Sequence, residues 1–121
     1  MNLSEKTMVN KLLFDRAQLL ENIDNDAILA EQLMTLYLKQ LDQILLSIQE
    51  AVELGDKRLA LSLAHKMKGS SASICCQLIS QKAAHIESHL KTEGFNVAFI
   101  KDLINQIQHD ATQFSQLLKV G

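Results

Sequence analysis

The residue in this sequence best suited to chemistry is His65, because an imidazole with the usual pKa of about 6.5 is largely neutral, and so nucleophilic, at pH 7. Apolar residues recur at helical spacing over residues 57 to about 74. At about 100° per residue they form one arc, and His65 lies about 165° from its centre. The predicted core arc comprises Leu59, Ala60, Leu63, Ala64, Met67, Ser71 and Ile74. We therefore expect the imidazole to point into solvent.

Six residues surround His65 on this outer face, at offsets of three, four or seven positions: Arg58, Leu61, Ser62, Lys68, Gly69 and Ala72. The Lys68 ammonium is placed where it could balance the charge of a phosphoryl group on the ring. Gly69 costs a helix interior up to about 1 kcal/mol relative to alanine, and its missing side chain leaves room beside the imidazole. Leu61 and Ala72 add apolar surface on which a partner could dock.

Long amphipathic helices must hold this surface in place. The first is predicted over residues 27 to about 54, where the apolar stripe is Leu29, Leu33, Leu36, Tyr37, Leu41, Ile44, Leu45, Ile48 and Val52. Gly55 closes this helix and Asp56 caps the next, so the two are antiparallel neighbours joined by a short turn. The second helix, over residues 57 to about 74, carries His65.

Two further long helices are predicted, one over residues 77 to about 91 and one after a break at Thr92-Glu93-Gly94. The last has the stripe Phe99, Ile100, Leu103, Ile104, Ile107, Ala111, Phe114 and Leu118. Asp15 is expected to cap a short leading helix that reaches about Ile23. The prediction is an all-α, up-and-down antiparallel four-helix bundle with a short extra N-terminal helix. The bundle domain spans residues 14–120, and residues 1–13 are a leader or a frayed segment.

The composition agrees with a single helical domain. The chain has 121 residues, 47% of them hydrophobic, and no proline. The formal net charge of −2 does not indicate a nucleic-acid partner, and no apolar stretch is long enough to span a membrane. We expect no contact of this domain with a membrane. Residues 1–14 lack a signal peptide, and the adjacent Cys75 and Cys76 suit reduced thiols, so we expect a cytoplasmic protein.

The motif around His65 resembles that of a known family. Histidine-containing phosphotransfer (HPt) domains have a signature similar to Gly55-Asp56 followed by Leu63-Ala64-His65-Lys66-Met67-Lys68-Gly69-Ser70-Ser71-Ala72-Ser73. The resemblance extends over roughly residues 14–120. It implies that His65 is the phosphorylated residue, that Lys68 helps to hold the phosphoryl group and that Gly69 keeps the surface open.

The resemblance also implies a function in two-component signalling. His65 would accept a phosphoryl group from the aspartate of a response-regulator receiver domain and pass it to another receiver, with a hybrid sensor histidine kinase as a further partner. The chain would be a monomeric carrier without ATP binding or autokinase activity, since it has no phosphate-binding loop or kinase motif. It would bind no cofactor, and the Mg²⁺ of the reaction would belong to the receiver.

Three positions carry less specific expectations. Many family members have a second glycine about ten residues after the histidine, where this chain has Cys75. Cys75 would either narrow the approach of a receiver or alter the packing of the helix end. Glu87 and Lys91, on the helix that follows, are expected as secondary contacts with the partner, together with Arg58, Leu61, Ser62, Ala72 and Cys75.

Other interpretations remain open. The bundle could be a dimerisation or docking module that carries an exposed histidine by chance, or a degenerate HPt domain that binds receivers without transfer. His85 and His89 are four residues apart and could face one metal ion, but no third ligand is evident. A metal or haem bundle would need ligands on facing core positions. His109 is expected at the surface.

Overall fold

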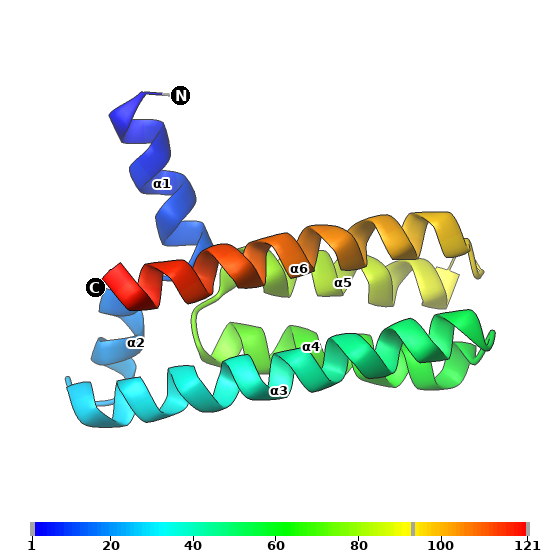
Figure 1. Ribbon diagram of the computed structural model, residues 1–121, viewed down its shortest axis with the longest axis horizontal. Helices are drawn as coiled ribbons and strands as arrows, with labels where there is room; N and C mark the ends of the chain where they lie inside the picture. The colour runs from blue at the N-terminus through cyan, green and yellow to red at the C-terminus, as the bar shows by residue number, and fades with distance from the viewer. Residues whose placement is uncertain (1, 93, 121) are drawn as a thin grey trace.

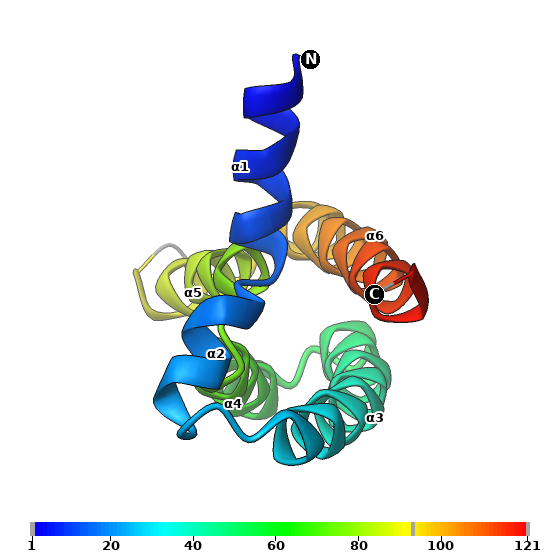
Figure 2. The same ribbon diagram turned by 90° about the vertical axis from the view of Figure 1, so that its left-hand side faces the viewer.

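The computed structural model describes the backbone of residues 2–92 and 94–120 and the side chains up to residue 118. In this part of the chain there are six helices and no strand: α1 (Leu3–Leu13), α2 (Arg16–Asn22), α3 (Ala27–Glu53), α4 (Lys57–Ser73), α5 (Gln77–Thr92) and α6 (Val97–Val120). The last four lie side by side, each antiparallel to the next (Figures 1 and 2). The predicted all-α, up-and-down bundle is confirmed. Met1, in the predicted leader, and Glu93, in the predicted break, lie outside the described residues.

The segment expected to be a leader or frayed is helical. The Asn2 side chain accepts the Glu5 backbone N–H at 2.9 Å, and the Glu5 carboxylate accepts the Asn2 N–H at 3.3 Å. This capping box satisfies two N–H groups that would otherwise have no partner, and so starts α1. Leu13, at the end of α1, is buried, while the rest of the helix points away from the bundle (Figure 1). The helix predicted after Asp15 is α2, so α1 is an additional element.

Aspartates begin the next three helices. The side chains of Asp15, Asp26 and Asp56 each accept a backbone N–H three residues on, at 3.0 to 3.1 Å. Such caps satisfy one of the free N–H groups in the first turn of a helix and place a negative charge at its positive end. The caps expected at Asp15 and Asp56 are therefore confirmed.

Most of the predicted stripes form the core, with four exceptions. Leu29, Leu59 and Phe99 are exposed, and each is the third residue of its helix, in the first turn at an end of the bundle. Leu36 is 52% exposed and lines a groove between α3 and α4. The prediction that these four belong to the core is wrong. On α4 the arc that is buried is Ala60, Ala64, Met67, Ser71 and Ile74.

Two polar contacts tie neighbouring helices together inside the bundle. The hydroxyl groups of Tyr37 on α3 and Ser71 on α4 share a buried hydrogen bond of 2.7 Å. Lys82 on α5 and Asp110 on α6 form a mostly buried ion pair of 2.5 Å. Breaking one partner of such a contact leaves the other buried and unpaired, which is costly. These contacts therefore restrict sliding of α4 and α5 against the rest of the bundle.

The turn from α4 to α5 repeats the turn from α3 to α4. Gly55 has φ of +70°, and Cys75 has φ of +64°. In the second turn the Cys75 N–H donates to the Ala72 carbonyl at 3.1 Å and the Cys76 N–H to the Ser71 carbonyl at 2.9 Å. This is a Schellman motif, whose left-handed residue is usually glycine. The position where many family members have glycine is therefore a helix end, and of the two effects expected of Cys75 the structure favours the altered helix end.

The backbone at Cys75 predicts a stability difference between two variants. Cys75→Gly and Cys75→Ala both remove the sulfur, but only alanine keeps a Cβ in the left-handed region, where a residue other than glycine costs about 1–2 kcal/mol. We expect Cys75→Gly to exceed Cys75→Ala in free energy of unfolding by about 1 kcal/mol, measured by urea denaturation. Equal stabilities would mean that the turn is not strained.

Candidate functional site

The candidate site is built from α4 and α5 around one carboxylate. The Glu87 Oε2 atom lies 2.6 Å from His65 Nδ1, and its Oε1 atom accepts a hydrogen bond from Lys68 Nζ at 2.5 Å. Lys91, one turn further along α5, places its Nζ 3.7 Å from Glu87 Oε2. Two hydrogen bonds, between residues 22 and 19 positions apart in the sequence, thus join α4 to α5 through Glu87. The looser ion pair with Lys91 lies within α5.

The groups of this cluster differ in exposure. The His65 side chain is 69% exposed, as the helical wheel predicts, whereas that of Glu87 is 7% exposed. The imidazole therefore stands on the surface and the carboxylate lies beneath it. The sequence suggested Glu87 as a contact with a partner, but its side chain lies beneath the surface, where it bonds to His65 and Lys68.

The charge of Glu87 is stabilised by its neighbours. The hydrogen bond from Lys68 is the main cause that holds the pKa of Glu87 below its usual 4.5, with help from His65 and from the charge of Lys91, although burial acts in the opposite direction. Glu87 is therefore ionised at neutral pH and can only accept hydrogen bonds. We accordingly assign the ring proton of neutral His65 to Nδ1, which leaves Nε2 as the unprotonated nitrogen.

The surface beside His65 is open. A Cβ atom at Gly69 would meet no atom within 4 Å other than its own helix neighbours. Internal packing therefore does not require glycine here, which agrees with a role in keeping the surface clear. The Ser80 hydroxyl on α5 donates to the Lys68 carbonyl at 2.9 Å, and the Ser73 hydroxyl donates to the Gly69 carbonyl at 3.0 Å. These bonds support α4 at the point where glycine weakens it.

The other residues expected to contact a partner are spread along α4 and α5. Arg58, Ser62, Ala72 and Lys91 are exposed, and Leu61 is half-buried. Cys75 lies apart from the His65 cluster, at the end of α4. There its carbonyl accepts the Asp15 N–H at 3.0 Å, and its sulfur accepts the Asn22 amide at 3.8 Å. Burial raises the pKa of its thiol, so this sulfur is not an activated nucleophile.

The remaining histidines have other environments. His89 is buried, its Nε2 accepts the Asn96 N–H at 3.0 Å, and its ring packs against Phe99 at 4.7 Å between centroids. That nitrogen serves the connection between α5 and α6. His85 and His109 are exposed, as expected for His109.

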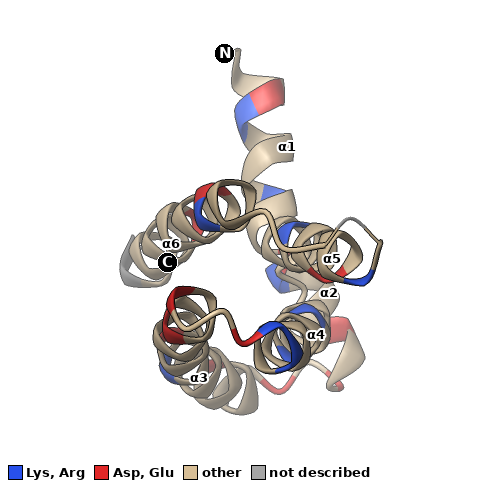
Figure 3. Cartoon of the chain, turned by 90° about the vertical axis from the view of Figure 1, so that its right-hand side faces the viewer, with Lys and Arg blue, Asp and Glu red and all other residues tan. Residues whose placement is uncertain are grey.

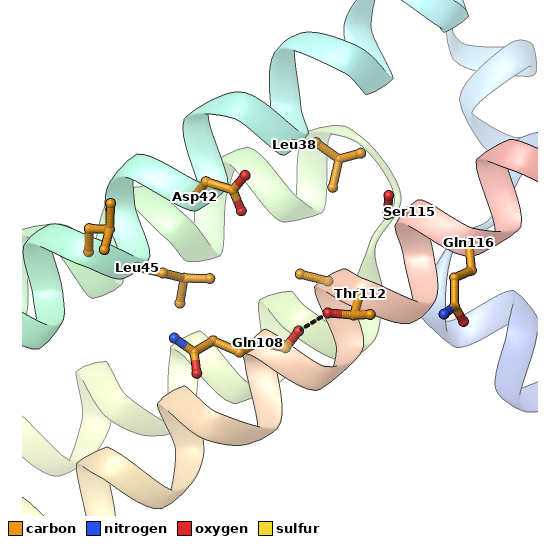
Figure 4. Close-up of a pocket in the computed structure, with 9 residues that line it drawn as sticks. Leu38, Asp42, Leu45, Gln108, Thr112, Ser115 and Gln116 are labelled. Atoms are coloured by element: carbon orange, nitrogen blue, oxygen red, sulfur yellow. Dashed lines mark hydrogen bonds between the residues drawn. The ribbon is translucent and has the colours of Figure 1, made fainter.

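A cavity of about 670 Å³ lies between α3 and α6, away from the helices that carry the histidine cluster. Figure 4 shows that its lining is mixed, with the carboxylate of Asp42 beside Leu38 and Leu45 on one side and the Gln108 amide on the other. The Thr112 hydroxyl is already bonded to the Gln108 carbonyl at 3.1 Å. None of the residues that the sequence singled out for chemistry lines this cavity.

The sequence analysis missed the central role of Glu87. Its position gave a signal, because it borders the apolar stripe of α5, where Ile79, Ala83, Ile86 and Leu90 are fully buried. A carboxylate beside such a stripe must be paired if it is buried. Its two lysine partners come from different helices, and only Lys91, four residues on, could be inferred from spacing.

The fold and the site define an antiparallel helical bundle with a supported histidine on its outer face. The sequence model of the Hpt domain family matches residues 32–116, which is more than half of the chain. This chain therefore belongs to the Hpt domain family. Its function is phosphotransfer in two-component signalling. Hpt domains act as phosphocarriers rather than kinases, and their partners are receiver domains and histidine kinases.

Comparison of structures supports the same fold. The crystal structure of the HPT domain of an Hpt sensor hybrid histidine kinase from Shewanella is similar with a TM-score of 0.73 and 22% sequence identity. The match covers 91% of this chain and 97% of that one. No curated protein sequence matches this chain. No helix in the described part of the chain is long and apolar enough to cross a membrane.

The lowered pKa of Glu87 predicts how stability depends on acid. Because the folded chain holds this carboxylate in its charged form, its contribution to stability is complete above the usual pKa of 4.5 and is lost as the pH falls through the lower folded value. Glu87→Gln removes this contribution. We expect the difference in free energy of unfolding between wild type and Glu87→Gln to shrink between pH 7 and about pH 3.

Urea denaturation at a series of pH values measures this difference. Glu50→Gln is the matched control, because Glu50 is exposed on α3 and forms no ion pair with a described residue. Its difference from wild type should stay nearly constant over the same range. A constant difference for Glu87→Gln as well would contradict the prediction.

Proposed function

We propose that Nε2 of His65 accepts a phosphoryl group from the aspartyl phosphate of one receiver domain and passes it to the aspartate of another. The observation that carries this proposal is the 2.6 Å contact between Nδ1 and the buried carboxylate of Glu87, which leaves Nε2 free on an exposed ring. A histidine exposed by chance would not require a buried, ionised partner, since burying a charge is costly.

The transfer step follows from this geometry. The Nε2 lone pair attacks phosphorus, the bond from phosphorus to the aspartate oxygen breaks, and the aspartate carboxylate leaves with the electron pair of that bond. The Nδ1 proton stays in place, so the phosphorylated ring becomes positively charged. The negative charge of Glu87 lies against that ring and stabilises it. Transfer to a second receiver is the same step in reverse.

Lys68 has a second possible partner in this reaction. Its Nζ is bonded to Glu87 in the described state, and its side chain, one turn from His65 on the same side of α4, is 37% exposed. When a phosphoryl group is on Nε2, the ammonium can turn toward it, since a flexible lysine acts as a mobile point charge. Lys91 then remains near Glu87 and keeps the carboxylate compensated.

The remaining features of the proposal follow the family resemblance. The Mg²⁺ of the reaction would be held by the receiver, and this chain would work as a cytoplasmic monomer, because a receiver must reach His65 across a free surface. The two free cysteines suit a reducing compartment. The competing interpretation is a docking module without transfer, and the experiments below separate the two.

The first experiment tests the phosphorylated residue. Incubation with a panel of phosphorylated receiver domains should label the wild type with phosphate that is labile in acid and stable in base, and His65→Gln should carry none. His85→Gln and His109→Gln are matched controls, because both side chains are exposed histidines on neighbouring helices. They should be labelled like the wild type.

Either of two results would contradict the phosphotransfer proposal. Label on His65→Gln would assign another acceptor. A folded wild type that takes no label from any receiver would favour the docking module.

The second experiment tests Glu87 as a positioning residue. Glu87→Gln keeps the shape of the side chain but loses its charge, and a hydrogen bond to a charged group contributes about 1.5–3 kcal/mol. If the bond strengthens as the ring becomes positive, we expect the single-turnover rate of transfer to fall about 10- to 100-fold. Glu50→Gln should transfer at the wild-type rate.

A spectroscopic measurement separates positioning from folding. In ¹⁵N spectra of the wild type, His65 should be mainly the tautomer protonated at Nδ1, and Glu87→Ala should shift the ring toward the Nε2-protonated form. A loss of rate without any change of tautomer would mean that Glu87 does not position the ring and acts only through its charge or through stability.

A further inference from the structure

Positive charge is concentrated on the two helices that carry the site. Residues 57–92 contain six Lys and Arg residues and one acidic residue, Glu87, whereas the rest of the chain contains six Lys and Arg residues and thirteen Asp and Glu residues. α4 itself has four basic residues and no acidic one. In Figure 3 α4 carries only blue bands, whereas the end of α3 that faces the viewer is red. The net charge of −2 therefore hides a strongly asymmetric distribution.

Part of this positive charge is not neutralised within the chain. Lys57, Arg58 and Lys66 are exposed and form no ion pair with a described residue. Lys68 and Lys91 share the single charge of Glu87, and Lys82 is paired with Asp110. The nearest exposed carboxylate in the sequence is that of Asp56, which caps α4 beside Lys57.

The three unpaired cations flank His65. At about 100° per residue, Arg58 lies within about 20° of His65 around the α4 axis, and Lys57 and Lys66 lie about 80° and 100° away on opposite sides. All three are exposed. Along the axis Lys66 is the next residue after His65, whereas Lys57 and Arg58 lie about two turns toward the start of α4. An approaching anionic group therefore meets positive charge beside the imidazole and along the helix to one side of it. Charges of one sign gathered around a reacting group raise the local concentration of an oppositely charged partner.

We propose that Lys57, Arg58, Lys66, Lys68 and Lys91 form a basic docking surface that steers an acidic protein surface, the one surrounding a partner's aspartyl phosphate, onto His65. This inference rests on the proposed function and names the chemistry of the partner. The phosphoryl group is itself anionic, so it is attracted to the same surface. The acidic remainder of the chain repels such a partner, and the charge distribution thereby selects the orientation in which it arrives.

A protein partner fits this surface better than a nucleic acid does. Residues 57–92 contain no Phe, Tyr or Trp on which a base could stack. The surface also has the half-buried Leu61 and the exposed Ala72 among its cations, which suits a protein interface with an apolar centre.

The test compares two pairs of charge reversals that alter the net charge equally. Lys57→Glu with Lys66→Glu changes the basic docking surface at residues that make no hydrogen bond in the site. Lys6→Glu with Lys11→Glu changes α1, which projects from the opposite end of the bundle (Figure 1). Receiver domains are first phosphorylated with acetyl phosphate. The second-order rate constant of phosphotransfer from each receiver to this chain is then measured at several salt concentrations. One receiver has an acidic surface around its aspartate, and the other has a basic one.

We expect the Lys57 and Lys66 reversal to slow transfer from the acidic receiver about tenfold at about 20 mM NaCl and less than about twofold at about 0.5 M, because salt screens steering. The α1 reversal should stay within about twofold of wild type throughout. The basic receiver should be the slower donor for the wild type at low salt and should gain from the Lys57 and Lys66 reversal. Circular dichroism confirms that the variants are folded.

Contrary results separate the two proposals. If wild type is labelled at a rate that neither salt nor the Lys57 and Lys66 reversal changes, steering is overturned and the phosphotransfer proposal stands. If wild type takes no label at any salt concentration, both fail. A short DNA duplex provides a further check. If it binds the wild type as tightly as the acidic receiver does, and the Lys57 and Lys66 reversal abolishes this binding, the surface is a general polyanion site and the proposal of a protein partner is overturned.

Discussion

The site depends on the hydrogen bond between the ring of His65 and the carboxylate of Glu87, which joins an exposed side chain on α4 to a buried one on α5. A shift of either helix along its axis would break it. The serine hydroxyl that bonds to the Lys68 carbonyl fixes the same pair of helices locally. The Tyr37–Ser71 and Lys82–Asp110 contacts then fix α4 and α5 against α3 and α6. A rigid bundle is how this chain holds one imidazole in one orientation.

The buried carboxylate also explains why the site needs more cations than the reaction does. A lone buried charge is costly, so Glu87 requires a cation beside it at every stage of the proposed reaction. Before the proposed transfer Lys68 and Lys91 compensate Glu87, and afterwards Lys91 and the positively charged ring would do so while Lys68 turns toward the phosphoryl group. The carboxylate of Glu87 would thus have a cation beside it both before and after transfer, although the cation changes.

The sequence was sufficient for the four-helix bundle and for the outward position of His65, though not for α1, because helix periodicity, aspartate caps and the glycine turn are local properties. Periodicity could not identify the exposed Leu29, Leu59 and Phe99, since their burial depends on whether a neighbouring helix reaches the end of the bundle. Nor could it place Glu87 beneath His65, because that contact joins two helices. The net charge of the whole chain also concealed the uneven distribution of charge. The basic residues of α4 and α5 become a basic surface only when the fold places them around His65.

The exposure of the imidazole has a consequence for timing. Water reaches Nε2 from the same side as a partner, and Gly69 leaves that side open. If His65 carries the phosphoryl group on Nε2, as proposed, that group is subject to two competing fates, hydrolysis and capture by an acceptor. The fraction delivered is set by the ratio of the capture rate to the hydrolysis rate, and the capture rate is proportional to the concentration of free acceptor. On the same proposal, the abundance of the acceptor in the cell would directly set how much of the phosphoryl signal is delivered.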